Sequence, residues 1–266
     1  MKVSVITVTW NSKDFILKQI HSVRKAVHFL DFEHIIVDNA SSDGTVASIE
    51  DKFSWVHIIR NIENKGFSAA NNQAFAIATG DYILFLNPDC ELAPGSLDTF
   101  VEWMDAHPKV GIAGPKLVDV HGVINQRAAP RRFPKFFEQI ALILKLPHVF
   151  PSILDNYLMK GFDFDREQEV DSVQGSCILV RRSLLHTLGF AFDPRYFIWF
   201  EDVDLCRECI AHGMKVMYTP VVIAIDYSGQ SFKKRKFWWK QKQFFTSMMI
   251  YFRKWGFQSK KEKVES

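Results

Sequence analysis

Residues 3–11 read VSVITVTWN, a run in which apolar side chains alternate with hydroxyl-bearing ones until a polar Asn closes it. Alternation that is rich in Val, Ile and Thr is typical of a β-strand. Ser12 follows as a helix N-cap, and apolar residues at positions 15, 16, 20 and 23 share one face of the helix predicted after it. A strand followed directly by an amphipathic helix predicts the first βα unit of a parallel sheet.

The same pattern repeats outward from this stretch. Strands are predicted at 34–37, 56–59 and 82–86, with helices in the intervals between them. Polar clusters come directly after strands, DNASSDG at 38–44 and NPD at 87–89. Open α/β sheets bind ligands at the carboxyl ends of their strands, so these clusters indicate a nucleotide-binding half. No G-x-G-x-x-G follows the first strand, which disfavours a dinucleotide dehydrogenase.

The rhythm of the sequence changes after Pro115. A hairpin is predicted over 116–126, and an aromatic strand at 197–200 runs into the acidic segment EDVD at 201–204. A last pair of strands is predicted over 216–225, divided at its proline. The second half is therefore expected to add a different kind of strand arrangement to the first.

Composition and charge divide the chain into two unequal regions. Hydrophobic residues make up 47% of the 266, which excludes wholesale disorder. Residues 232–266 hold eleven Lys and Arg against two Glu, a net charge of +9, which leaves −6 for the rest. Four cysteines are too sparse for a disulfide scaffold, and we recognise no signal peptide or membrane-spanning segment, so a cytoplasmic protein is expected. An acidic body with a basic, aromatic tail indicates two separate roles.

The strand-end residues 87–89, Asn-Pro-Asp, are a candidate metal site. A carboxylate such as Asp89, together with substrate phosphates, is how Mg²⁺ or Mn²⁺ is commonly held. The alternative is a plain turn, which these three residue types also favour. Asp38 and the segment 64–72 also have two interpretations. They bind a nucleotide or sugar, or they only cap the helices that follow.

The acidic residues Glu201, Asp202 and Asp204 also have two interpretations. Carboxylates at a helix start complement the helix macrodipole. A carboxylate beside Trp199 and Phe200 instead has its basicity raised, as a general base requires. The residues alone leave these alternatives open.

Cys206 and Cys209, with His212 nearby, have the form of half a zinc site. A zinc ligand set of this kind is normally completed by a second pair of ligands, and none follows. Cysteine is among the residues most often buried in protein cores. Buried structural thiols are therefore the favoured interpretation.

Taken together, these segments resemble family 2 glycosyltransferases of the GT-A fold, especially bacterial rhamnosyltransferase-like members. The resemblance covers roughly residues 3–231 and rests on segments that occur in order: 3–11, 37–45, 64–67 with 71–72, 86–89, 174–177 and 200–206. It implies an α/β fold with a Rossmann-like nucleotide-binding half and a mixed central sheet. The implied domains are 1–231, with a donor half of about 1–115 and an acceptor half of about 116–231, and a helical tail at 232–266.

The resemblance also implies roles for individual residues. Asp202 falls on the catalytic base, with Glu201 beside it, and Asp89 falls on the metal-binding carboxylate of a Mg²⁺ or Mn²⁺ site. A His that commonly completes the metal shell in this subgroup is replaced here by Asp226. The implied donor-binding residues are Thr9, Asn11, Asp38, Asn64, Gly66, Asn72, Asn87 and Gly175. The acceptor or its phosphate is assigned weakly to Arg131, Arg132 and Trp199.

The implied function is inverting transfer of a sugar from a nucleotide-diphosphate donor, dTDP-rhamnose first and a UDP-hexose second, to a saccharide or polyprenyl-diphosphate-linked acceptor in cell-surface polysaccharide synthesis. The first alternative is a non-catalytic nucleotide- or nucleic-acid-binding protein that uses the basic tail, and the second is a carbohydrate-binding pseudoenzyme. Nucleic-acid binders usually carry a basic body, whereas this body is acidic, so no nucleic-acid partner is expected.

The tail itself predicts a membrane contact. Residues 232–245 mix six cations with six aromatic side chains. On a helix, an apolar stripe would be formed by Phe237, Phe244, Phe245, Met248 and Phe252. Such a helix over 232–255 would lie in the plane of an anionic leaflet and hold the protein on the inner face of the cytoplasmic membrane. The alternative is a helix docked on the body.

Overall fold

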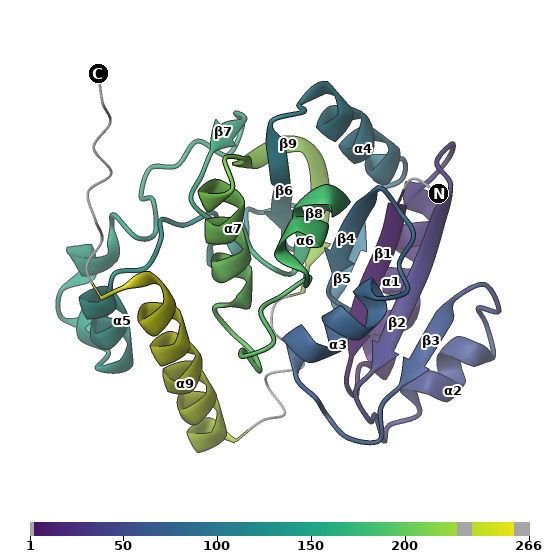
Figure 1. Ribbon diagram of the computed structural model, residues 1–266, viewed down its shortest axis with the longest axis horizontal. Helices are drawn as coiled ribbons and strands as arrows, with labels where there is room; N and C mark the ends of the chain where they lie inside the picture. The colour runs from purple at the N-terminus through teal and green to yellow at the C-terminus, as the bar shows by residue number, and fades with distance from the viewer. Residues whose placement is uncertain (1–2, 228–235, 258–266) are drawn as a thin grey trace.

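The predicted βα units form one half of a mixed sheet. The computed structural model describes residues 3–227 and 236–257, and its strands follow the order β3-β2-β1-β4-β8-β6-β9-β5 (Figure 1). The first four strands in this order are mutually parallel. They are β1 (Val3–Thr9), β2 (Phe32–Asp38), β3 (His57–Arg60) and β4 (Tyr82–Leu86), connected by α1 (Lys13–Ala26), α2 (Thr45–Glu50) and α3 (Phe67–Phe75).

Side-chain alternation along β1 explains why both faces of the sheet are covered. Val3 and Val5 pack into a cluster with α1 and with α4 (Ser96–Ala106) on one face. Ile6 points the other way, into a cluster with α3. Because successive strand residues face opposite sides, a strand of this composition is buried only between two helical layers. The carboxyl ends of the strands are thereby left as the accessible edge.

The second half of the chain adds antiparallel pairings. Strand β8 (Cys177–Arg181) is antiparallel to both β4 and β6 (Val110–Val118), and β6 is parallel to β9 (Lys215–Asp226). The remaining elements are β5 (Cys90–Leu92), η1 (Gln126–Ala128), α5 (Phe136–Ile143), η2 (Leu146–His148), η3 (Pro151–Leu154), β7 (Gln168–Glu169), α6 (Arg182–Leu188), α7 (Glu201–Ala211) and α9 (Phe237–Trp255). The sheet is therefore mixed, as predicted.

Two local expectations are wrong. The predicted strand pair over 216–225 is the single strand β9, in which Pro220 falls within a register irregularity between Thr219 and Ile223. A proline donates no backbone hydrogen bond, so within a sheet it is found at irregularities such as bulges, where the strand-to-strand hydrogen bonding is already interrupted.

The predicted aromatic strand at 197–200 is instead a turn, because Trp199 and Phe200 both have φ of 68°. Left-handed backbone at two successive residues is incompatible with an extended strand.

Helix α9 docks on the body through its C-terminal half. Met248, Tyr251 and Phe252 are buried in a cluster with Tyr196 and Phe200, and side chains of α5 pack against that cluster. Figure 1 shows α9 beside α5 and α7, at the end of the molecule away from β2 and β3. Much of the apolar stripe predicted to enter a bilayer is therefore occupied by protein. Residues 232–235 of that predicted helix lie outside the described residues.

A charged group fastens the same end of α9. The ammonium group of Lys254 lies 2.7 Å from carboxylate oxygens of Asp204 and of Glu208, and 3.1 Å from Asp193. We call these three acids and Lys254 the anchor cluster. Burial alone would raise the pKa of Asp193, but hydrogen bonds from Arg195 and Lys254 outweigh it and lower that pKa to about 2. A paired and hydrogen-bonded charge is the form in which charges are retained in protein interiors.

The cysteine pair on α7 is buried. Cys206 and Cys209 are both free thiols in the cluster between α7 and the sheet, as the structural interpretation predicted. Burial raises the pKa of both thiols above the usual range, which keeps them protonated. Within residues 3–227 and 236–257, we find no helix with both the length and the apolarity needed to cross a bilayer.

Candidate functional site

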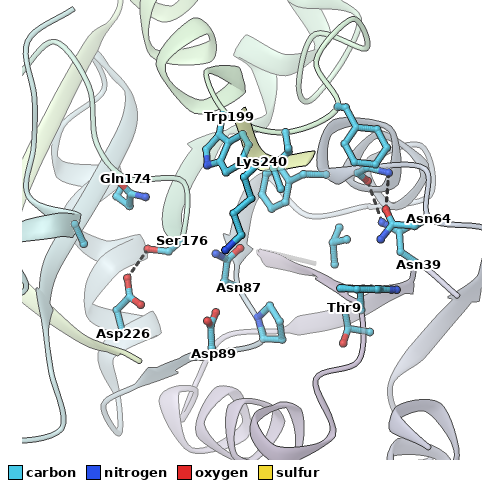
Figure 2. A pocket seen from close by; sticks show the side chains of 18 of the residues that line it. Thr9, Asn39, Asn64, Asn87, Asp89, Gln174, Ser176, Trp199, Asp226 and Lys240 are labelled. Carbon is cyan, nitrogen blue, oxygen red and sulfur yellow. Dashed lines mark hydrogen bonds between the residues drawn. The ribbon is translucent and has the colours of Figure 1, made fainter. Parts of the chain in front are cut away.

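A cavity of about 510 Å³ opens at the carboxyl ends of β1, β2 and β4. Its lining from the first half of the chain is Val8, Thr9, Trp10, Asn39, Asn64, Gly66, Phe67, Asn87, Pro88 and Asp89. Its lining from the second half is Arg127, Ala128, Gln174, Ser176, Phe197, Ile198, Trp199, Asp226, Trp239 and Lys240. The ligand edge predicted from the polar strand ends is thus a real cavity, closed on its other side by the second half (Figure 2).

Asp89 and Asp226 form a carboxylate pair in this cavity, called here the pocket pair. Both residues are buried, with 6% and 7% of their surface exposed. Asp226 is the register partner of Cys90 across β5 and β9, which brings it next to Asp89. The hydroxyl of Ser176 donates a hydrogen bond to Asp226 Oδ2 at 3.1 Å (Figure 2). Two carboxylates that are 137 positions apart in sequence therefore line the same cavity.

Asn87 and Ser176 connect the pocket pair to the rest of the wall. The backbone N–H of Asn87 donates to the carbonyl of Ser176 at 2.8 Å, so the Asn-Pro-Asp turn is held against the loop before β8. The N–H of Tyr227 donates to the carbonyl of Asp89 at 3.0 Å. These backbone bonds fix the turn, so its side chains are positioned before any ligand arrives.

Asparagine side chains shape the opposite wall. Asn39 Nδ2 donates to the carbonyl of Gly66 at 3.0 Å, and Asn64 Oδ1 accepts from the N–H of Gly66 at 3.0 Å. Gly66 has φ of 89°, and a Cβ there would lie 2.6 Å from the carbonyl oxygen of Phe197. Only glycine allows this approach, which seats the start of α3 against the 197–200 turn.

Two buried oxygens at the ends of β1 and β2 have no hydrogen-bond donor among the described residues. They are Thr9 Oγ1 and Asp38 Oδ1, and the two residues are direct register partners. The other oxygen of Asp38 accepts from the N–H of Ser41 at 3.0 Å. An unsatisfied buried acceptor costs about 1–3 kcal/mol, so such atoms mark places where a ligand donor is stabilising. Thr9 lines the cavity, and Asp38 lies directly beside it.

Asp202 lies behind the loop that forms one wall. Its Oδ2 accepts a hydrogen bond of 2.9 Å from the N–H of Gly175, and the neighbours of Gly175 on both sides line the cavity. Burial raises the pKa of Asp202, against the hydrogen bonds from Gly175 and Val203 and the charge of Arg131, which lower it. A raised pKa suits a carboxylate that must accept a proton near neutral pH.

Glu201 is placed less favourably than its neighbour. Burial and the charge of Asp202 raise the pKa of Glu201 well above its usual range, which favours the protonated form. Its Oε2 is buried with no hydrogen-bond partner in the described part of the chain. Neither acid is among the residues that line the cavity directly.

Four predicted site residues have structural contacts instead of facing the cavity. Asn72 accepts from the N–H groups of Ala191 and Phe192 and donates to the carbonyl of Phe192, which ties α3 to the segment before the 197–200 turn. Asn11 Oδ1 accepts from the N–H of Ser42 and shapes the loop after β1.

The two predicted acceptor arginines behave similarly. Arg132 forms an ion pair with Asp171 at 3.2 Å. Arg131 donates to the carbonyl of Arg127 at 2.7 Å and lies over the ring of Tyr157. Trp199, the third predicted acceptor residue, does line the cavity.

Several lining residues were not predicted as site residues from the sequence, and Arg127, Trp239 and Lys240 are among them. The rings of Trp239 and Trp199 lie 6.5 Å apart, and Phe197 is 5.9 Å from Trp239, so α9 continues the aromatic wall of the cavity. The basic, aromatic run that contains Trp239 and Lys240 was interpreted as a membrane helix. Its pocket-facing residues could be found only by knowing where the helix docks.

A family model described as glycosyl transferase family 2 matches residues 4–189. The N-acetylglucosaminyl-diphospho-decaprenol L-rhamnosyltransferase of Mycobacterium tuberculosis is 27% identical over 214 residues, which cover 74% of this chain and 67% of the relative. The Escherichia coli rhamnosyltransferase WbbL is 28% identical over 194 residues, covering 68% of this chain and 69% of that protein.

Solved structures share the fold at low sequence identity. Staphylococcus aureus TarS, residues 1–349 in complex with UDP, superposes with a TM-score of 0.58 at 18% identity, covering 85% of this chain and 60% of that one. A mannosyltransferase from Pyrobaculum calidifontis in complex with GDP-Man and Mn²⁺ gives a TM-score of 0.62 at 18% identity, covering 95% of this chain and 64% of that one. These likenesses concern the architecture alone.

Proposed function

Because the chain belongs to glycosyl transferase family 2 and has the GT-A fold, we propose that it moves a sugar from a nucleotide-diphosphate donor to a saccharide acceptor with inversion of the anomeric carbon. dTDP-rhamnose is the favoured donor and a UDP-hexose the next, since two relatives are named as rhamnosyltransferases. The observation that carries the proposal is the cavity at the strand ends, which holds the pocket pair and has Asp202 immediately behind its wall.

The base of the nucleotide is assigned to the ends of β1 and β2. The acceptor oxygen Asp38 Oδ1 needs a donor, and the imide N–H of a pyrimidine supplies one. Thr9 Oγ1, its neighbour across the two strands, both donates and accepts. This arrangement supports a uracil or thymine nucleotide over a sugar without a base.

A divalent cation fits the pocket pair. Mg²⁺ and Mn²⁺ take oxygen ligands, and Mg²⁺ in particular is usually held by one or two carboxylates plus substrate phosphates. Asp89 and Asp226 supply two buried carboxylates at adjacent positions, and the hydroxyl of Ser176 holds Asp226 in place. A bound cation would neutralise charge on the departing diphosphate. Asp226 would supply an oxygen ligand at the position where the subgroup commonly has the nitrogen ligand of a His.

Asp202 carries the proton transfer in this mechanism. It accepts the proton of the acceptor hydroxyl while that oxygen forms its bond to the anomeric carbon, and the bond between this carbon and the diphosphate oxygen breaks. A single displacement of this kind inverts the carbon and needs no enzyme nucleophile. The N–H of Gly175 orients the Asp202 carboxylate, and Trp199 offers an aromatic face to a sugar ring.

A lipid-linked acceptor would bring the protein to a membrane, and part of α9 remains suited to that role. Trp238 is 81% exposed, and Phe237 and Phe245 are about half exposed. Exposed Lys236 precedes Phe237, and exposed Lys242 lies between Trp238 and Phe245. Aromatic side chains interleaved with lysines bind the interface of an anionic leaflet. We therefore assign peripheral contact with the inner face of the cytoplasmic membrane to the N-terminal half of α9, in place of the whole stripe.

Turnover with purified nucleotide sugars tests the proposed function. The full chain is incubated with dTDP-rhamnose, UDP-glucose and UDP-N-acetylglucosamine, each with a prenyl-diphosphate-linked saccharide, with Mn²⁺ or with EDTA. Release of nucleoside diphosphate that requires the acceptor and stops in EDTA supports a metal-dependent transferase. Asp89→Ala should behave as wild type does in EDTA. Activity indifferent to chelation refutes the metal assignment alone, while inactivity across a broad donor and acceptor panel refutes the function.

Sedimentation with vesicles tests the membrane contact separately. Full-length protein should cosediment with phosphatidylglycerol vesicles at low salt and be released as salt rises, because ionic attraction is screened. Trp238→Ala combined with Phe245→Ala should weaken this binding and leave nucleotide binding intact. Equal sedimentation of the double variant and wild type would reject the assignment.

A further inference from the structure

One face of α9 runs continuously from the anchor cluster to the donor cavity. Lys240, Phe244, Ser247, Tyr251 and Lys254 are spaced four, three, four and three residues apart, so they form a single stripe along the helix. Tyr251 and Ser247 on this stripe are buried, and Phe244 packs against the same cluster. The stripe therefore faces the body along its whole length.

The two lysines at its ends have different surroundings. Lys254 is enclosed by the acids of the anchor cluster. Lys240 lies about 21 Å further along the axis, at 1.5 Å for each of 14 residues. There the body gives way to the cavity, and the side chain of Lys240 extends into it in the direction of Asn87 (Figure 2).

The position of Lys240 is fixed by contacts on both sides of it along the chain. The hydroxyl of Ser247, two helical turns on, donates to the carbonyl of Ile198 at 2.7 Å, which attaches the helix to the cavity wall. The ring of the preceding Trp239 packs against Phe197 and Trp199. Lys240 is half-buried, whereas Lys236 at the N-cap of α9 and Lys242 within the helix are exposed.

A positive charge at this place suits a diphosphate. A diphosphate that enters the cavity lies near the two carboxylates of the pocket pair, and a lining cation reduces the repulsion between these negative groups. Among the described residues, Lys240 and Arg127 are the lysine and the arginine that line the cavity. Of these two, Lys240 belongs to a helix whose face is buried against the body. Lysine binds phosphate as a point charge on a flexible stem, which suits a group that must be released after transfer.

We propose that Lys240 of α9 binds the diphosphate of the nucleotide donor and stabilises it as it leaves. This inference rests on the proposed function and deepens it, because it makes the C-terminal helix part of the donor site. A domain boundary at 231 would separate Lys240 from the cavity that it completes. The prenyl diphosphate of an acceptor carries the same chemistry, but Lys240 lines the same cavity as Asn87, Asp89 and Thr9, which favours the donor.

Calorimetric titration of the full chain with dTDP and UDP tests the proposal. Lys240→Met should weaken the binding of whichever nucleoside diphosphate wild type binds by about 10- to 100-fold, the worth of a charged hydrogen bond. Lys240→Arg should restore most of it. Arg253→Met, which removes an exposed positive charge from the same helix, should bind as wild type does. The corresponding nucleoside, which has no phosphate, should bind wild type and Lys240→Met equally.

Several outcomes would overturn this assignment. Equal nucleoside diphosphate affinity in wild type and Lys240→Met would reject it and leave the transferase standing. An equal loss for nucleoside and diphosphate would make Lys240 a shaper of the cavity. A loss seen only with farnesyl diphosphate would move Lys240 to the acceptor. Failure of wild type to bind dTDP, UDP or any other nucleoside diphosphate would remove the proposed function, and this inference with it.

Discussion

Two acidic groups in one body differ in what surrounds them. The anchor cluster encloses its own cation, Lys254, which is contributed by α9. The pocket pair, Asp89 and Asp226, faces a cavity at the sheet edge. The ion pairs of the anchor cluster form within the folded protein, and they stabilise the docking of α9 on the body. The pocket pair lines the cavity in which we propose that a divalent cation binds. Acid clusters of similar composition thus divide between stability and binding according to what faces them.

Helix α7 carries this division within one short motif. Asp202 and Asp204 are two residues apart, which turns them about 200° from each other around the helix axis. Asp202 accepts from the N–H of Gly175 beside the cavity, whereas Asp204 accepts from Lys254, Trp255 and Tyr196. One segment therefore supplies a candidate base on one side and a structural anchor on the other.

The largest expected difference between Asp202 and Asp204 is in the rate of sugar transfer. Asp202→Asn should lower the rate of transfer by about 10²–10⁴-fold, because an amide cannot accept the acceptor proton. The asparagine keeps the shape of the side chain, so the Kd for nucleoside diphosphate should change little. Steady-state rates and calorimetry on the same preparation measure both. Glu201→Gln is the companion variant: a dead Glu201→Gln beside an active Asp202→Asn would transfer the role of base to Glu201.

For the free energy of unfolding, the larger effect is expected from the change at Asp204 and the smaller from the change at Asp202. Asp204→Asn should lower the free energy of unfolding by about 3 kcal/mol, because it removes one carboxylate from a buried, hydrogen-bonded charge group. Asp202→Asn should change it by less than about 1 kcal/mol, since Asp202 belongs to none of the ion pairs found in the described part of the chain. Urea unfolding followed by circular dichroism provides the comparison. Equal losses from the two variants would contradict the division of labour along α7.

The smallest effect is expected in the pH dependence of the rate. Burial raises the pKa of Asp202, and only the deprotonated carboxylate acts as a base, so the rate should fall on the acid side at a higher pH than for an exposed aspartate. The charge of Arg131 and the hydrogen bonds from Gly175 and Val203 oppose this rise. Arg131→Met should therefore shift the acid limb to higher pH.

Arg132→Met serves as the matched control for that shift, because Arg132 pairs with Asp171 instead. Rates measured at saturating donor and acceptor between pH 4 and pH 8 locate the limb in each protein. An acid limb unmoved by Arg131→Met would show that the titrating group lies elsewhere.

The first half of the fold was predictable because its signals are local. In β1 and β4, alternating or continuous apolar residues specify strands, and the polar residues that follow each strand mark the ligand edge. Asn64, Gly66, Asn87 and Asp89 could be assigned to the cavity for the same reason. Asn72 could not be separated from them, since its partners Ala191 and Phe192 are more than 100 positions away.

The second half depended on contacts that sequence spacing does not reveal. The residues at 197–200 have strand-like composition, yet Trp199 and Phe200 adopt left-handed backbone under the packing of α9. An apolar stripe on α9 suits lipid and protein equally well. The docking of α9 on the body depends on the ion pairs of Lys254 with Asp193, Asp204 and Glu208. These acids lie about 46 to 61 residues before Lys254 in sequence.

The left-handed turn at Trp199 and Phe200 has a consequence for how the protein is made. Each such residue costs about 1–2 kcal/mol, which packing against Phe244 and Tyr251 offsets. On the ribosome, α9 emerges after every other described element, since chains are synthesised and fold from the N-terminus. Until α9 has emerged, the three acids of the anchor cluster lack Lys254, and the turn at Trp199 and Phe200 lacks its packing against Phe244 and Tyr251. The cavity is thus completed last, when residues 237–255 have left the ribosome and Trp239 and Lys240 join its lining.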